Sequence, residues 1–268
     1  MNSTSSGFKK RLSQYHDLRL LYEQDIKVNH ISEVLDICHP HDDAQIIKSY
    51  MEEKDYDVLG VEEDERVIGY VRKEGLKDGF CRNYINHFSP KELVSESTPL
   101  IKILYLFRET ERIFVLEENR VTRLVTKADL QKPPIRMLLF GIITLLEMHL
   151  LKVINHYLPQ DAWKKHLDNG RIQKAEVIYT ERRIKNEAIG LIDCLQICDK
   201  RDIILNELNI RKQLKIPSKT KGKDYFKRLE KLRNNLAHAQ ELNAEGSWDD
   251  MILLIEETEE IFETCEGI

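Results

Sequence analysis

The fold of the N-terminal half is decided by Val121-Thr122-Arg123-Leu124-Val125-Thr126-Lys127-Ala128-Asp129-Leu130. The stretch from Val121 to Val125 is short and mostly apolar, with β-branched residues, which predicts a strand. Thr126 and Asp129 stand three residues apart, which is the spacing of a capping box in the first turn of a helix. The sequence therefore predicts a strand that passes directly into a helix near Leu130.

The same order of elements is expected twice between about residues 31 and 130. Apolar residues recur at helical spacing in two stretches, and each stretch is followed by a short strand, an acidic turn and a second strand. The matched segments are 45–51 with 100–106, 58–61 with 113–116, 62–66 with 117–120, and 67–71 with 121–125. We expect a unit of helix, strand, turn, strand and helix with a period of 54 or 55 residues and one extra residue in the first turn. Each unit has a small sheet, so the two units must pack together.

Over residues 25 to 134 the sequence resembles the tandem cystathionine-β-synthase (CBS) domain pair, most clearly in Leu124 to Leu130. The resemblance implies an α+β module that binds an adenine nucleotide (ATP, ADP, AMP or a cyclic form) between its repeats as a regulatory ligand. It assigns the ribose hydroxyls to Asp129, the phosphates to Thr126, and the remaining phosphate and adenine contacts to Ser97 and Ile113. Helix capping by Thr126 and Asp129 is the alternative interpretation of the same motif.

The first repeat departs from the family pattern. Arg72 and Gly75 stand where the Thr and the Asp are expected, so the carboxylate that holds a ribose is missing there. In the second repeat Arg123 replaces the usual Gly. We therefore expect at most one nucleotide site per chain.

Beyond Pro133-Pro134, which is expected to end the module, the sequence is helical in pattern. We predict a tail at 1–17, the CBS-like module at 18–134 and an all-helical bundle domain at 135–268. The expected helices are 135–157, a short one from Pro159 to Gly170, 171–197, one from an Asp199 cap to 208, 224–241, and one that begins at Ser247 with Asp250 in a capping box; residues 210–223 are expected to form a basic loop.

The predicted helix 224–241 carries Arg233-Asn234-Asn235-Leu236-Ala237-His238. Asn234 and His238 are four residues apart and share a face, and Arg233 lies beside them. Arg233 and His238 are separated by about 140° on an ideal helix. Two copies across a two-fold axis could supply the missing groups to each other, so we expect a homodimer.

This stretch resembles the HEPN domain (higher eukaryotes and prokaryotes nucleotide-binding), over about residues 135 to 265. The resemblance implies a metal-independent endoribonuclease, with Arg233 on the phosphate, His238 moving a proton and Asn234 orienting the imidazole. Some members have an acid on the first long helix, and Glu147 matches it. Gln240 stands where one toxin subgroup has Tyr, which argues against that subgroup. The alternative for Arg-Asn-x-x-x-His is a salt bridge on a polar helix face.

Composition limits the function. The chain has 268 residues, 41% hydrophobic and 32% charged, and a net charge of −5, which indicates a globular protein and no general polycation. The five cysteines fit no disulfide framework, and Cys38-His39-Pro40-His41 lacks a second ligand pair, so we expect no metal site and a cytoplasmic location. Residues 137–146 are too short to span a bilayer before Glu147, and the polar start 1–7 predicts no signal peptide, so no membrane partner is expected.

The leading hypothesis is an adenine-nucleotide-regulated endoribonuclease that needs no cofactor for catalysis. Its substrate is RNA rather than DNA, because the nucleophile is the substrate's own 2′-hydroxyl. The resemblance also implies a role in the response to stress or phage attack. The alternative hypothesis is a non-catalytic nucleotide sensor or RNA-binding adaptor in which Arg233 and His238 are structural.

Overall fold

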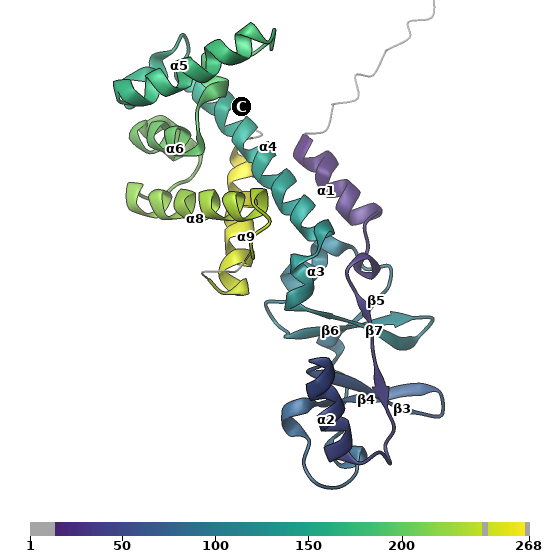
Figure 1. Cartoon of the computed structure of the whole chain (residues 1–268). Helices are drawn as coiled ribbons and strands as arrows, with labels where there is room; N and C mark the ends of the chain where they lie inside the picture. Colours follow the sequence, from purple (N-terminus) through teal and green to yellow (C-terminus); the bar gives the residue numbers. More distant parts are fainter. Residues whose placement is uncertain (1–13, 243–245, 266–268) are drawn as a thin grey trace, which may run out of the picture. The chain divides into compact units, whose positions relative to one another are not determined.

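The computed structural model describes residues 14–242 and 246–265 and divides the chain into two compact units (Figure 1). One unit is Leu20–Ile135, and the other combines residues up to Arg19 with Arg136–Ile268. The division falls one residue after the expected boundary at Pro134. Residues 14–17, expected in the tail, form the first turn of helix α1 (Gln14–Gln24), and residues 1–13 lie outside the described residues.

The unit Leu20–Ile135 contains the expected repeat. The first copy consists of β2 (Ile37–Cys38), α2 (Ala44–Lys54), β3 (Val58–Glu63), β4 (Arg66–Arg72) and the 3-10 turn η2 (Lys73–Gly75). The second consists of β5 (Leu93–Ser95), α3 (Leu100–Leu106), β6 (Arg112–Glu117), β7 (Arg120–Thr126) and η5 (Lys127–Gln131). In each copy a short 3-10 turn, and not the expected α-helix, follows the second strand. The predicted order of helix, strand, turn and strand is confirmed in both copies, but the short strands β2 and β5 that precede the helices were not predicted.

The two hairpins are superimposable in register with a shift of 54 residues. Asp64-Glu65 and Glu118-Asn119 form their two-residue loops, and all four residues have positive φ, which matches the twist of a tight hairpin. Each hairpin also has an irregularity at the same place, between Val61 and Glu62 and between Val115 and Leu116. The prediction of one extra residue in the first turn is therefore wrong. Ile113 corresponds to Leu59 and not to Val58, and this one-residue shift changes the face of the sheet.

The strands form two sheets, and one short strand crosses between the repeats. The three-stranded sheet has the order β2-β3-β4, and the four-stranded sheet has the order β1-β7-β6-β5. Strand β1 (Glu33–Val34) precedes the first repeat in sequence, but it pairs antiparallel with β7 of the second repeat. The chain before the first repeat therefore lies against the strand that ends at Thr126.

Alternate residues of the first sheet face two different apolar layers. One layer packs under α2 and contains Leu59, Val61 and Val71 together with Met51. The other contains residues of both sheets: Leu35, Val58, Tyr70, Phe114 and Val121. In this second layer the ring of Phe114 lies 4.9 Å from that of Tyr70 and 4.7 Å from that of Phe88, centroid to centroid. Each sheet thus buries one face against the other repeat, as the period-two pattern requires.

Pro133 and Pro134 do not end the module as predicted. Lys132 is extended (ψ 151°), as predicted, but Pro133 and Pro134 are the first residues of α4 (Pro133–Tyr157). Proline suits this position because the N–H groups of the first turn have no partner within the helix. The apolar pattern also continues beyond Glu147, so α4 is long and apolar enough to cross a bilayer by length and composition. Half of its most apolar window is buried inside the protein.

In the second unit, the described residues from 136 onward form helices and 3-10 turns only. They are the rest of α4, η6 (Ala162–His166), α5 (Asn169–Ile184), η7 (Leu191–Cys194), α6 (Ile197–Asn206), α7 (Leu208–Gln213), α8 (Lys219–Ala237) and α9 (Trp248–Cys265). Three predictions were wrong here. Gly170 lies inside α5, and Asp199 is the third residue of α6 behind its cap, Gln196. The long helix expected at 171–197 ends at Ile184, and Gly190 is the cap residue of η7. The Ser247–Asp250 capping box is confirmed.

The predicted basic loop 210–223 is mostly helical. Helix α7 ends at Gln213, and α8 begins at Lys219 after the cap Ser218, whose hydroxyl accepts from the N–H of Lys221. Gly222 suggested a loop, but it is buried inside α8, where an added Cβ would lie 2.4 Å from Leu205 Cδ2. This glycine therefore allows a close approach to a neighbouring helix and does not break α8.

Gly69 allows a second close approach, in the three-stranded sheet. A Cβ at Gly69 would lie 2.6 Å from the backbone oxygen of Asn86, which accepts from the N–H of Tyr70. Because that oxygen is fixed by the bridge, we expect Gly69→Ala to lower the free energy of unfolding by about 1–3 kcal/mol in urea titrations. Gly75→Ala is the control, since nothing lies within 4 Å of its added Cβ. A Gly69→Ala change as mild as that of Gly75→Ala would contradict this account.

Candidate functional sites

The Arg/His stretch occupies the C-terminal end of α8, where it meets α4. Arg233 and Asn234 are exposed in the last turn, and Arg233 Nη1 donates to Asn234 Oδ1 at 3.4 Å. Glu147 of α4 places Oε1 3.7 Å from Arg233 Nε. His238 is the exposed residue that directly follows the helix, with φ −103° and ψ 13°. The structure thus brings Glu147 to Arg233, and it places Asn234 and His238 on the same end of α8.

Glu147 is shared between two cations. Its Oε2 accepts from Lys200 Nζ of α6 at 2.6 Å, and the side chain of Lys200 is only 5% exposed. The side chain of Arg233, by contrast, is 48% exposed. Lys200 is therefore the structural partner, and Arg233 keeps part of its guanidinium exposed to solvent. No sequence pattern indicated the buried position of Lys200, because a lysine inside a helix is normally a surface residue.

The backbone that carries His238 is held in place by α4. Arg136 donates from Nη2 to the carbonyl of Asn235 at 3.0 Å and from Nη1 to the carbonyl of Gln240 at 2.9 Å. Asn235 is buried, and its side chain donates to the carbonyl of Glu241 at 3.0 Å. An arginine at carbonyls that have no partner within the helix is a favourable C-terminal cap. In Arg233-Asn234-Asn235, the second Asn is structural and the first is the exposed one.

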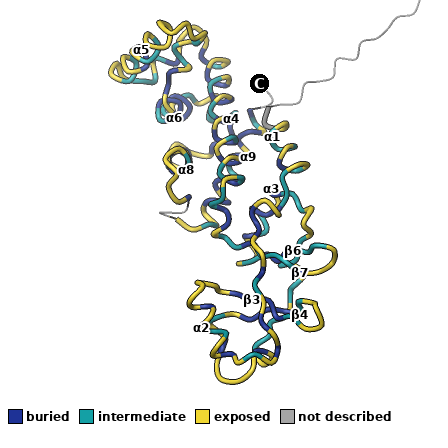
Figure 2. Tube along the Cα trace, turned by 45° about the vertical axis from the view of Figure 1, so that its right-hand side comes forward, coloured by how far each residue is buried: buried dark blue, intermediate teal, exposed yellow. Residues whose placement is uncertain are grey.

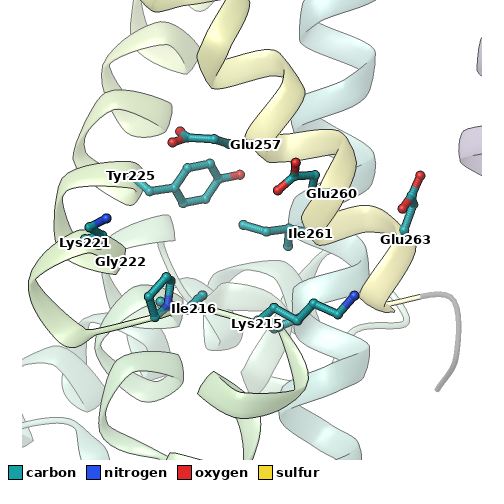
Figure 3. A pocket seen from close by; sticks show the side chains of 11 residues that line it. Lys215, Ile216, Lys221, Gly222, Tyr225, Glu257, Glu260, Ile261 and Glu263 are labelled. Carbon is teal, nitrogen blue, oxygen red and sulfur yellow. The ribbon is translucent and has the colours of Figure 1, made fainter.

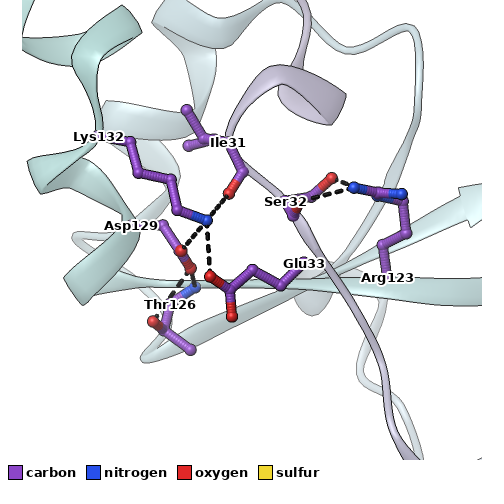
Figure 4. A network of polar contacts seen from close by, with 7 residues as sticks. All are labelled: Ile31, Ser32, Glu33, Arg123, Thr126, Asp129 and Lys132. Carbon is purple, nitrogen blue, oxygen red and sulfur yellow. Dashed lines mark hydrogen bonds and ion pairs between the residues drawn. The ribbon is translucent and has the colours of Figure 1, made fainter.

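The Thr126–Asp129 motif forms the capping box that the sequence predicted (Figure 4). Asp129 Oδ2 accepts from the backbone N–H of Thr126 at 2.7 Å and from its hydroxyl at 3.1 Å. Asp129 Oδ1 pairs with Lys132 Nζ at 2.6 Å. Lys132 also donates to the carbonyl of Ile31 and to Glu33. Both oxygens of this buried carboxylate are therefore bound by groups of the chain itself.

The ammonium group of Lys132 is the cation that pairs with Asp129. Burial would lower the pKa of Lys132, but the hydrogen bonds to Asp129 and Glu33 outweigh it and hold the pKa above its ordinary value. The amine is therefore charged at neutral pH. A ribose that approaches Asp129 Oδ1 has to share that oxygen with Lys132 or displace it. Arg123, on the next strand position, donates instead to the hydroxyl and carbonyl of Ser32, each at 2.7 Å.

A cavity of about 60 Å³ lies at Asp129 and is lined by both repeats. Its lining residues are Glu33, Val34, Leu35, Asp36, Tyr56, Val58, Leu124, Thr126 and Asp129. Ser97 and Ile113 do not line it. Ile113 is fully buried in β6 on the face opposite to Phe114, while Ser97 lies after β5 and bonds to Ser95. The sequence missed Tyr56, Val58 and Asp36, which belong to the first repeat.

The helical unit has a larger cavity of about 480 Å³ between the start of α8 and the end of α9 (Figure 3). Its floor is apolar, with Ile216 and Ile261, and Lys215 and Lys221 face three glutamates of α9 across it. Tyr225 lies at its side, and its hydroxyl is within 3.0 Å of Thr258 Oγ1; burial raises the pKa of this tyrosine. None of the residues predicted to be functional lines this cavity.

Comparisons with known proteins gave structural neighbours only. No protein-family profile matches the sequence, and no curated protein matches it. An uncharacterized conserved protein from Pyrococcus horikoshii is 21% identical, with 40% of this chain and 90% of that chain covered and a TM-score of 0.36. A CBS domain pair/ACT domain protein from Thermotoga maritima is 20% identical (42% and 98% covered, TM-score 0.35). The CBS-pair protein CBSX2 from Arabidopsis thaliana is 15% identical (42% and 96% covered, TM-score 0.36), and CBSX2 is also known in complex with AMP. Two of these three neighbours are described as CBS domain pairs, and each likeness concerns about two fifths of this chain.

The contribution of the Glu147–Lys200 ion pair to stability can be measured with variants. Glu147→Gln removes the carboxylate from the buried ammonium of Lys200, so we expect the free energy of unfolding to fall by about 2–4 kcal/mol. Lys200→Met in the same background removes the stranded charge and should recover part of that loss. Urea titration of the two single variants and the double variant measures the coupling. Strictly additive losses would show that the Glu147–Lys200 pair has no energetic role.

Proposed function

We propose that this chain is an endoribonuclease controlled by an adenine nucleotide. In the proposal the helical unit cuts RNA at Arg233 and His238, and the unit Leu20–Ile135 acts as a CBS pair that binds the nucleotide. The contact that carries the proposal is the one between Glu147 and Arg233. It joins an acid on the first long helix to the arginine of the Arg-Asn-x-x-x-His motif, at a place where the guanidinium stays half exposed.

The proposed reaction is an attack by the 2′-hydroxyl of the RNA on the adjacent phosphorus. The bond from phosphorus to the 5′-oxygen breaks, and a 2′,3′-cyclic phosphate and a 5′-hydroxyl are the products. The imidazole of His238 takes or supplies a proton, which is the commonest role of histidine in general acid–base catalysis. Arg233 binds the phosphate oxygens as charge develops on them, and Glu147 fixes the direction of its guanidinium. Asn234 donates to a phosphate oxygen or orients His238.

A second copy of the chain completes the proposed site. Arg233 is on the last turn of α8, whereas His238 lies beyond the helix and is followed by Ala239 with φ 53°. One phosphate needs a proton donor and a proton acceptor on opposite sides, but the stretch contains one imidazole. Two stretches across a two-fold axis supply both.

Regulation is proposed to pass through Lys132. This residue directly precedes Pro133, the first residue of α4, and α4 carries Glu147. A nucleotide that takes Asp129 Oδ1 releases Lys132 from its ion pair, and this alters the anchoring of the start of α4. The nucleotide then controls cleavage only if it binds the active and inactive arrangements with different affinity.

A non-catalytic sensor or adaptor is the second candidate function. The observation in its favour is the ion pair itself, because Arg233 already has a carboxylate partner in Glu147. In that case Arg233 and His238 hold RNA or stabilise the fold without cutting.

Cleavage of labelled single-stranded RNA separates the two functions. We expect Arg233→Ala and His238→Ala to lower the rate by at least about 100-fold, which is the usual contribution of a general acid or base. His156→Ala, which removes another exposed imidazole of the helical unit, should leave the rate unchanged. Cleavage that is equal in all variants, or absent from the wild type with and without ATP, ADP and AMP, would refute the endoribonuclease.

Calorimetry with AMP, ADP, ATP and cyclic nucleotides tests the regulatory site. We expect Asp129→Asn to weaken binding by at least about tenfold, because an amide keeps the cap but loses the charged acceptor for ribose hydroxyls. Glu53→Gln removes an exposed charge from α2 and serves as the control. Unchanged affinity in Asp129→Asn would show that the nucleotide binds elsewhere.

A further inference from the structure

The outer face of α8 carries lysines in a row that ends at the Arg/His stretch. Its buried face consists of Gly222, Tyr225, Phe226, Leu229, Leu232 and Asn235. On the opposite face Lys223 and Lys227 are exposed and Lys231 is half-buried, and these lysines are four residues apart. Figure 2 shows exposed segments along α8. Asn234, three residues after Lys231, is exposed in the last turn of α8, and the exposed His238 directly follows the helix. Residues three or four apart lie on one face of a helix, so the row is continuous from Lys223 to Asn234.

We propose that this row is a track for the phosphate backbone of a single-stranded nucleic acid, leading to Arg233 and His238. The track deepens the proposed function, since it names how the RNA strand would be held. Its lysines are about 6 Å apart along the helix axis, a spacing close to that of neighbouring phosphates in an extended strand. Flexible ammonium groups bind phosphates without regard to sequence.

The charges around the track favour an anion. Within the part of the chain that the structure describes, Lys223 and Lys227 have no carboxylate at ion-pair distance. Of the two acids on α8, Asp224 is bonded to Arg228, which also bonds Glu257 of α9 at 2.6 Å. Glu230 is the second acid, and it subtracts one charge from the row. The face therefore remains positive although the whole chain has a net charge of −5.

The face has no apolar anchor for another kind of partner. Of the large hydrophobic side chains that are exposed in the described residues, none lies within α8. Protein interfaces have buried aromatic or aliphatic anchors, and a membrane-bound helix inserts an apolar face. A row of lysines without either feature fits a solvated polyanion. A single strand fits better than a duplex because its phosphates can follow one helix in line with the site.

The test uses a 2′-O-methyl RNA oligonucleotide of about twelve nucleotides, which cannot react through its 2′-oxygen. We expect Lys223→Gln/Lys227→Gln to weaken binding about tenfold at low salt and to reduce the slope of log affinity against log salt by about 1.4, or 0.7 for each lost phosphate contact. Lys174→Gln/Lys185→Gln removes two exposed charges from other parts of the unit and is the matched control. Fluorescence anisotropy measures both quantities.

Further binding and cleavage measurements test the track independently of the proposed endoribonuclease activity. Equal binding of single-stranded DNA of the same sequence supports recognition of phosphates alone, and a preference for 2′-O-methyl RNA supports an RNA-selective track. Tighter binding of duplex, binding only to anionic vesicles, or an unchanged salt slope in Lys223→Gln/Lys227→Gln overturns the track. A wild type that binds the strand through these lysines but cuts no RNA sinks the endoribonuclease and keeps the track.

Discussion

Glu147 stands between a buried cation and an exposed one, and the helical unit depends on how that carboxylate is shared. Lys200 needs it, because an ammonium that is 5% exposed is costly to bury without a partner. That requirement fixes Glu147 on α4 beside α6, and Arg233 of α8 reaches the second oxygen. One carboxylate therefore links three helices and holds an arginine at the surface. The same carboxylate therefore neutralises the buried ammonium of Lys200 and positions the exposed guanidinium of Arg233.

The α+β unit depends on the register in which its strands pair. Its two hairpins repeat with a shift of 54 residues, down to the positive φ angles of their turns. The repeat could be predicted because acidic turns and apolar strands alternate visibly in the sequence. The one-residue error in the strands could not be detected, because Val58 and Leu59 are both apolar and both buried. The family resemblance assigned Ile113 to the proposed nucleotide site, but Ile113 does not line the cavity at Asp129, and its side chain lies on the face opposite to that of Phe114.

In the helical unit the sequence predicted where helices exist better than where they end. Gly222 and Pro133-Pro134 predict breaks in the sequence pattern, yet Gly222 lies inside α8 and Pro133 opens α4. Both exceptions have tertiary causes, which a local pattern does not contain: Gly222 faces Leu205, and the first turn of α4 tolerates a missing N–H. The contact of Glu147 with Arg233 joins residues 86 positions apart, so only the family resemblance suggested it.

Asp129 shows why a motif and a site are different things. The sequence places a carboxylate where a ribose could bind, and the same three-residue spacing makes a helix cap. The structure uses Asp129 Oδ2 for the cap and gives Oδ1 to Lys132, in a cavity of about 60 Å³. That volume is too small for a whole nucleotide, so the proposed ligand would need this region to open. Lys132, whose amine pairs with Asp129 Oδ1, directly precedes Pro133, the first residue of α4. Under the proposed regulation, a nucleotide that binds Asp129 would have to displace this ion pair, and it would thereby change the anchoring of the start of α4.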